Sequence, residues 1–165
     1  MDHCLGRWDT VYPSASLKQI PGDGNCQFRA LAWALYNDES KHVIIRKTIC
    51  EYIQQNLHIY KEYVVDPDQY IGAMCKLGVF GDRITLQAFC DAYHANVLLL
   101  QDSDVVALMS PRRPVDGRHL VITYERGCHY NAVIPYTARP TDAFLRKITP
   151  HLNIENRVKL PITRH

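Results

Sequence analysis

Residues 21–30, with the sequence PGDGNCQFRA, constrain the fold more than any other stretch of the chain. The proline and two glycines within residues 21–25 interrupt any strand or helix that approaches from the N-terminal side. From Cys26 onward the apolar residues recur at helical spacing, so we expect a helix over residues 26–36. The sequence therefore predicts a tight turn that leads directly into a helix whose first residue is a cysteine.

Helical patterns come first along the chain, and strand patterns follow. A short extended segment is expected at residues 16–20. The expected helices cover residues 26–36, 42–56, 68–77 and 82–93, with Asp82 suited to cap the last of them. The expected strands cover residues 96–101, 118–124 and 129–135, and a short glycine-containing loop joins the last two as a hairpin. This order of elements predicts an α+β fold.

The composition indicates one globular domain. The chain has 165 residues, of which 47% are hydrophobic and 22% charged, which is enough apolar material for a core. With 19 basic and 17 acidic residues and no run of like charge, we expect no nucleic-acid or membrane-surface partner. No apolar run is long enough to span a bilayer, and the N-terminus lacks a secretory signal pattern. We therefore expect a cytoplasmic location, with the nucleus or the cytosol of a host as alternatives. We expect a monomer, because no heptad or long exposed apolar stripe is present.

Six cysteines would allow three disulfides. Cys50, Cys75 and Cys90 lie in apolar helical patterns that are typical of free thiols packed as small hydrophobic groups. Together with the missing export signal, this favours a reducing compartment without disulfides. No C-x-x-C pair occurs, so neither a metal site nor another cofactor is expected.

The placement of Cys26 favours a nucleophilic role. Successive turns can direct N–H groups into one concavity, and the helix adds free N–H groups and the positive end of its dipole. These groups stabilise a thiolate and an oxyanion formed on a substrate carbonyl. Two other interpretations stay open at this point. A glycine-rich turn before a helix also occurs around core cysteines, and Asp23 alone is typical of an N-cap or Asx turn.

A nucleophilic cysteine needs a base, and His129 is the best placed of the eight histidines. It opens a strand directly after a flexible turn, whereas His42 lies on a helix that we expect at the surface. Asn131 faces the same side of the strand as His129, so its amide oxygen can orient the imidazole ring. The alternative is that residues 129–131 are simply the polar start of a strand.

Three blocks of the sequence resemble motifs of the ovarian tumour (OTU) family of cysteine deubiquitinases. Residues 21–31 (PGDGNCQFRAL) resemble its nucleophile motif, and His129-Tyr130-Asn131 resembles its histidine block. Residues 78–88 (GVFGDRITLQA) resemble its second block, with Phe80 where the family usually has tryptophan. The blocks occur in the family's order.

The resemblance implies a papain-like OTU fold, in which a small central β-sheet packs between helices. It implies hydrolysis of the bond after the C-terminal glycine of ubiquitin, with ubiquitin or polyubiquitin as partner and other ubiquitin-like modifiers as further candidates. Cys26 would be the nucleophile, His129 the general base and Asn131 the residue that orients it. Asp23 would shape the oxyanion loop. Residues of this loop would bind the substrate oxygen, and other residues would border a narrow channel for the ubiquitin tail. The residues expected to contact the substrate in these two ways are Gly24, Asn25, Phe80, Gly81, Asp82, Arg126, Gly127 and Cys128.

The resemblance also divides the chain. It assigns residues 16–136 to the protease domain, and leaves residues 1–15 as an N-terminal extension and 137–165 as a tail or linker. Residues 103–118 are expected to form a variable loop. Two other functions use the same residues or the same fold: a papain-like protease that processes its own polyprotein, and a non-catalytic ubiquitin-binding module.

Overall fold

The computed structural model describes residues 3–4, 15–101, 106–113 and 119–137. The helices are α1 (Cys26–Tyr36), η2 (Glu39–Lys41), α2 (His42–Gln55), α3 (Leu57–Tyr60), η3 (Lys61–Tyr63), α4 (Pro67–Met74) and α5 (Arg83–Tyr93), where η marks a 3-10 helix. The strands are β1 (His3–Cys4), β2 (Ser16–Lys18), β3 (Asn96–Gln101), β4 (Val106–Met109), β5 (His119–Glu125) and β6 (His129–Ile134).

The strands form one sheet in the order β1-β2-β6-β5-β3-β4. β3 and β5 are parallel, and every other neighbouring pair is antiparallel. β5 and β6 form a hairpin in which Glu125 lies opposite His129. On the other side of β6, β2 runs antiparallel to it with Lys18 opposite Ala132. The chain therefore leaves β2 beside the start of β6 and then enters the turn that precedes α1.

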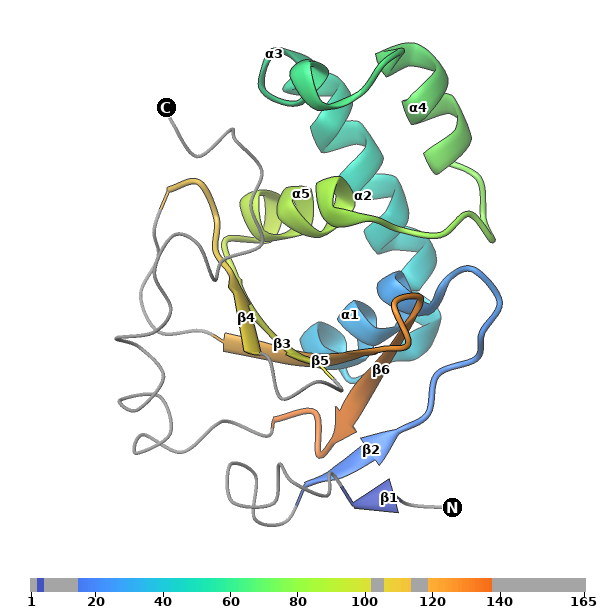
Figure 1. Cartoon of the computed structure of the whole chain (residues 1–165), viewed down its shortest axis with the longest axis vertical. Coiled ribbons are helices and arrows are strands. Elements are labelled where there is room, and N and C mark those ends of the chain that lie inside the picture. Colours follow the sequence, from blue (N-terminus) through green and yellow to red (C-terminus); the bar gives the residue numbers. More distant parts are fainter. Residues whose placement is uncertain (1–2, 5–14, 102–105, 114–118, 138–165) are drawn as a thin grey trace.

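The helices are layered on this sheet (Figure 1). α1 packs against β5 and β6, and α2 packs against both α1 and α5. The indole N–H of Trp33 in α1 donates to the carbonyl oxygen of Val133 in β6 at 2.8 Å. The helix that begins at Cys26 is thereby tied to the strand that begins at His129. Fully buried side chains of the core include Phe28, Leu31, Ile45, Ile49, Phe89 and Leu98.

The α+β fold, the predicted helices and the predicted hairpin are confirmed. Asp82 caps α5 as predicted, since its side chain accepts the N–H groups of Ile84 and Thr85 while the Thr85 hydroxyl accepts the N–H of Asp82. The expectation of a loop throughout residues 103–118 is wrong, because residues 106–109 form β4 and pair with β3. A four-residue apolar edge strand has no alternating pattern, and only its pairing with β3 defines it.

The ends of the chain are described only in part. His3 and Cys4 of the expected N-terminal extension form β1 at the edge of the sheet. The rest of that extension up to residue 14, and the expected tail from residue 138 onward, lie outside the described residues. Within the described ranges, no helix is both long and apolar enough to span a bilayer.

Candidate active site

Cys26 is the first residue of α1 and is 1% exposed. The turn before it approaches the segment that follows α4 so closely that only glycine fits at position 24. Gly24 has a φ of +85°, and a β-carbon there would collide with the carbonyl oxygen of Gly78. The backbone around Cys26 is therefore held between α1 and a segment more than fifty residues later in the sequence.

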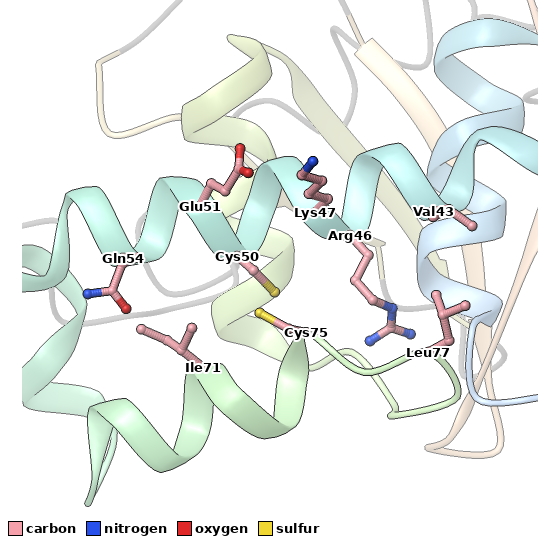
Figure 2. A pocket seen from close by; sticks show the side chains of 9 residues that line it. All are labelled: Val43, Arg46, Lys47, Cys50, Glu51, Gln54, Ile71, Cys75 and Leu77. Atoms are coloured by element: carbon pink, nitrogen blue, oxygen red, sulfur yellow. The ribbon is translucent and has the colours of Figure 1, made fainter.

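Arg46 holds the same turn from the side of α2. Although charged, it is 1% exposed. One guanidinium nitrogen donates to the side-chain oxygen of Asn25 at 2.9 Å and to the carbonyl of Gly24 at 3.3 Å, and another donates to the carbonyl of Met74 at 2.9 Å. The guanidinium carbon also lies 4.0 Å from the centre of the Phe28 ring. Figure 2 shows this side chain reaching from α2 toward the segment that carries Leu77.

Asn25 faces the interior. Its side-chain oxygen accepts the N–H of Gly78 at 2.8 Å in addition to the bond from Arg46. Asn25 is the N-cap residue of α1 but makes no capping hydrogen bond with its side chain. The side chain of Asn25 therefore holds the turn to the segment after α4 and does not cap the first N–H groups of α1.

Asp23 shapes the outer side of the turn. Its carboxylate accepts the N–H of Asn25 at 3.0 Å and two guanidinium N–H groups of Arg29, the shorter at 2.7 Å. The hydrogen bond from Arg29 holds the pKa of Asp23 well below its usual range. Arg29 also pairs with Glu39 at 3.3 Å. The carboxylate thus stays ionised and fixes the turn to the outer face of α1.

His129 and Asn131 are in contact as predicted. The Nε2 atom of His129 lies 3.0 Å from the side-chain oxygen of Asn131. That oxygen also accepts the N–H of Ile20 at 2.8 Å, and the Asn131 amide nitrogen donates to Glu125 at 2.7 Å. A backbone N–H can only donate, so the Asn131 atom in front of His129 is an acceptor, and Nε2 must carry the proton. Neutral His129 then has its lone pair on Nδ1.

The lone-pair edge of His129 faces the turn before Cys26. A β-carbon on Gly22 would lie 3.9 Å from both Nδ1 and Cε1 of His129. Cys26 and Tyr130 of β6 both belong to the buried core, and burial raises the pKa of Tyr130 to about 12. The fold thus places His129 beside the turn that leads directly to Cys26, and the pairing of these two residues as base and nucleophile stays a prediction.

The other expected substrate-contacting residues divide into exposed and internal ones. Phe80 is 57% exposed, and Arg126, Gly127 and Cys128 form an exposed turn with positive φ at the first two. The carboxylate of Asp82, by contrast, caps α5 and accepts the Tyr70 hydroxyl at 2.9 Å. A side chain on residue 81 would meet Gln27, whose amide bridges α1 to the carbonyl of Asp82 at 3.0 Å.

One expectation about a histidine is wrong. His42 does not lie on an exposed face but is buried, with 7% of its surface exposed. Two residues of the site were missed altogether, Arg46 and Glu125. The sequence contains a signal for the burial of Arg46, because this residue falls on the same face of its helix as Ile45 and Ile49. The sequence contains no such signal for Glu125, since only the hairpin register places it opposite His129.

A cavity of about 440 Å³ lies between α2, α4 and the residues that follow α4. Figure 2 shows the sulfur atoms of Cys50 and Cys75 pointing toward one another across it. Both thiols are free in the structure. Burial, together with a hydrogen bond to Cys75, raises the pKa of Cys50 to about 12, so this thiol is a poor nucleophile. No group of three metal-binding side chains occurs in the described part of the chain.

A family model described as OTU-like cysteine protease matches residues 21–132. Two relatives are OVARIAN TUMOR DOMAIN-containing deubiquitinating enzymes of Arabidopsis thaliana. Enzyme 11 is 35% identical over 139 residues (81% of this chain, 56% of that one), and enzyme 10 is 34% identical over 119 residues (70% and 33%). The chain thus spans about a third to just over half of these relatives' lengths.

Solved structures share the fold. The OTU domain of OTUD1 superposes with a TM-score of 0.67 at 24% identity, covering 74% of this chain and 87% of that one. An ovarian tumour (OTU) domain solved in complex with ubiquitin superposes with a TM-score of 0.62 at 16% identity, covering 74% of each chain. At these identities the similarity establishes the architecture of the chain.

Proposed function

Because the chain belongs to the family of OTU-like cysteine proteases, we propose that it is a deubiquitinating enzyme. Its reaction is hydrolysis of the isopeptide or peptide bond after the C-terminal glycine of ubiquitin. Two comparisons support this substrate: relatives at 34% and 35% identity are named deubiquitinating enzymes, and a similar domain was solved in complex with ubiquitin. Ubiquitin or polyubiquitin is therefore the proposed partner.

One observation supports the catalytic assignment more than any other: the orientation of His129. Its Nε2 is bound to Asn131, which leaves the Nδ1 edge against the turn that leads to Cys26. A general base must present a lone pair toward the nucleophile while its other nitrogen is held. We assign Cys26 as nucleophile, His129 as general base and acid, and Asn131 as the residue that orients it.

The reaction follows from these roles. His129 accepts the thiol proton at Nδ1, and the sulfur of Cys26 attacks the carbonyl carbon of the terminal glycine of ubiquitin. The proton then passes from His129 to the departing lysine amine, which leaves a thioester between Cys26 and ubiquitin. A water molecule that gives its proton to His129 attacks the thioester, and the products are the ubiquitin carboxylate and the regenerated thiol.

The turn before α1 would bind the oxyanion of each tetrahedral intermediate. Its proposed donors are the backbone N–H groups between Asp23 and Cys26 and at the start of the helix. Asp23, anchored by Arg29, and Asn25, anchored by Arg46, act as supports for this backbone. The exposed ring of Phe80 and the exposed turn at residues 126–128 would border the channel for the Gly-Gly tail, a channel that side chains larger than glycine would not pass.

Steady-state cleavage of ubiquitin with a fluorogenic C-terminal amide tests this assignment. Cys26→Ala should lower kcat at least about 10⁴-fold because the nucleophile is lost. Asn131→Ala should lower it less, by about 10²-fold, because His129 keeps its lone pair but loses its orientation. Cys75→Ser, which alters an exposed cysteine that has no role in the proposed mechanism, is the matched control and should retain wild-type kinetics. A Cys26→Ala protein with wild-type turnover would rule out the assigned nucleophile.

Two other functions are distinguished by simple comparisons. A papain-like protease that processes its own polyprotein would cleave peptide substrates at least as well as ubiquitin substrates. A ubiquitin-binding module would bind ubiquitin without turnover in the wild-type protein. The deubiquitinase assignment expects cleavage of ubiquitin substrates in strong preference to unrelated peptides.

A further inference from the structure

Glu125 is a neighbour of the proposed triad that none of the assigned roles uses. It is the last residue of β5, is half-buried, and lies opposite His129 in the hairpin register. One of its carboxylate oxygens accepts the side-chain N–H of Asn131 at 2.7 Å. The carboxylate, the amide and the imidazole therefore form a continuous chain of hydrogen bonds, with Asn131, only 3% exposed, at its centre.

The amide of Asn131 has one orientation that satisfies all its neighbours. Its oxygen faces two donors, the N–H of Ile20 and Nε2 of His129, and its nitrogen faces the carboxylate of Glu125. Rotation of the amide by 180° would place its NH₂ group against the N–H of Ile20 and its oxygen against the carboxylate. Both contacts would be repulsive, and the one with Ile20 is buried. Ile20 contributes through its backbone, so Glu125 is the side chain that selects the orientation.

We propose that Glu125 is a positioning residue of the active site, which fixes the Asn131 amide so that His129 carries its proton on Nε2. As a consequence, position 131 must hold an amide and not a carboxylate. An aspartate there would set two carboxylates at the distance of a hydrogen bond with no proton between them. The effect on catalysis rests on the proposed function, whereas the effect on the Asn131 amide does not.

Exchanging the two side-chain types tests the pairing. Glu125→Gln combined with Asn131→Asp reverses donor and acceptor, and keeps one hydrogen bond between the positions and an acceptor for both Ile20 and His129. Asn131→Asp alone brings the carboxylates together. Glu125→Gln alone keeps an acceptor but removes its charge, and Glu125→Ala removes both. Glu62→Gln, which neutralises an exposed glutamate of η3, is the matched control.

The expected kcat values differ between these proteins. The kcat of Asn131→Asp should be at least about tenfold lower than that of the wild type, and the kcat of the double variant should return to within about threefold of the wild-type value. The kcat of Glu125→Ala should fall about tenfold, and that of Glu125→Gln should fall less. The KM for ubiquitin should change little in either variant, because we assign Glu125 no contact with the substrate. A double variant as impaired as Asn131→Asp, or an Asn131→Asp protein as active as wild type, would overturn the proposal.

Two measurements decide the question without turnover. In protein labelled with ¹⁵N-histidine, the ring signals of His129, assigned with a His129→Gln variant, should show a protonated Nε2 and an unprotonated Nδ1. A proton on Nδ1 with none on Nε2 would overturn the proposal. In urea unfolding, Asn131→Asp should lower the midpoint and the added Glu125→Gln should restore it. If the wild-type protein cleaves no ubiquitin substrate, the proposed function fails while these two results still test Glu125.

Discussion

Gly24 shows how little freedom the backbone before Cys26 has. Its φ of +85° lies in the left-handed region, and the space for a β-carbon is already filled by the carbonyl of Gly78. The neighbouring side chains of Asp23 and Asn25 point in different directions and each has partners of its own, Arg29 on the surface and Arg46 inside. These residues therefore fix the position of Cys26 by holding the backbone in place.

Gly24→Ala should lower the free energy of unfolding by about 2 kcal/mol or more, because both the conformation and the contact with Gly78 resist a side chain. The matched control is Gly72→Ala, at an exposed glycine of α4 with no atom within 4 Å of the added carbon. That change should raise the free energy of unfolding by about 0.5–1 kcal/mol through helix propensity. Equal effects of the two substitutions in urea denaturation would contradict this account of the turn.

Among the elements, α2 connects parts of the site that are distant in sequence. It packs on α1 and α5, and through Arg46 it binds the turn before α1 and the end of α4. A buried guanidinium is costly to desolvate, and its several hydrogen bonds and its contact with Phe28 offset that cost. α2 therefore stabilises the fold and also sets the position of the turn.

Arg46→Met should lower the free energy of unfolding by about 2–4 kcal/mol, since three acceptors lose a charged donor in the interior. The free energy of unfolding of Arg46→Lys should lie between those of the wild type and Arg46→Met, because a single ammonium group cannot reach the same set of acceptors. Lys47 is an exposed neighbour on the same helix, and Lys47→Met should change the free energy of unfolding by less than about 0.5 kcal/mol. Chemical denaturation that gives similar losses for Arg46→Met and Lys47→Met would show that Arg46 does not support the turn.

At the scale of the whole molecule, the ionisation of one buried histidine links stability to pH. Burial, and then the positive charge of Arg29, lower the pKa of His42 from its ordinary value of 6.5. In the described part of the chain its Nδ1 has no hydrogen-bond partner. The unfolded chain binds a proton at His42 near pH 6.5, whereas the folded protein binds it only at lower pH. The contribution to stability is thus complete above pH 6.5 and is lost as the pH falls below it.

The free energy of unfolding should accordingly decrease between pH 8 and pH 5 in the wild-type protein. In His42→Gln the decrease should be smaller, because the substituted side chain does not titrate. Urea denaturation of both proteins at a series of pH values measures the difference. Parallel curves for the two proteins would show that His42 does not cause this part of the pH dependence.

The sequence predicted those parts of the molecule that local patterns determine. The helix that starts at Cys26, the cap at Asp82 and the contact between His129 and Asn131 each depend on residues a few positions apart. What it missed depends on tertiary structure. β4 is a strand only because it pairs with β3, and Glu125 meets Asn131 only through the hairpin register.

The account depends on one claim, that the thiol of Cys26 lies where His129 can activate it for attack on the C-terminus of ubiquitin. The most direct measurement is the reaction of the wild-type protein with ubiquitin that carries a C-terminal electrophile, followed by mass spectrometry of the intact adduct and its peptides. We expect one ubiquitin per chain, attached at Cys26 and absent in Cys26→Ala and in His129→Ala. Attachment at the exposed Cys75 or Cys128, or equal labelling of the His129→Ala protein, would contradict the claim.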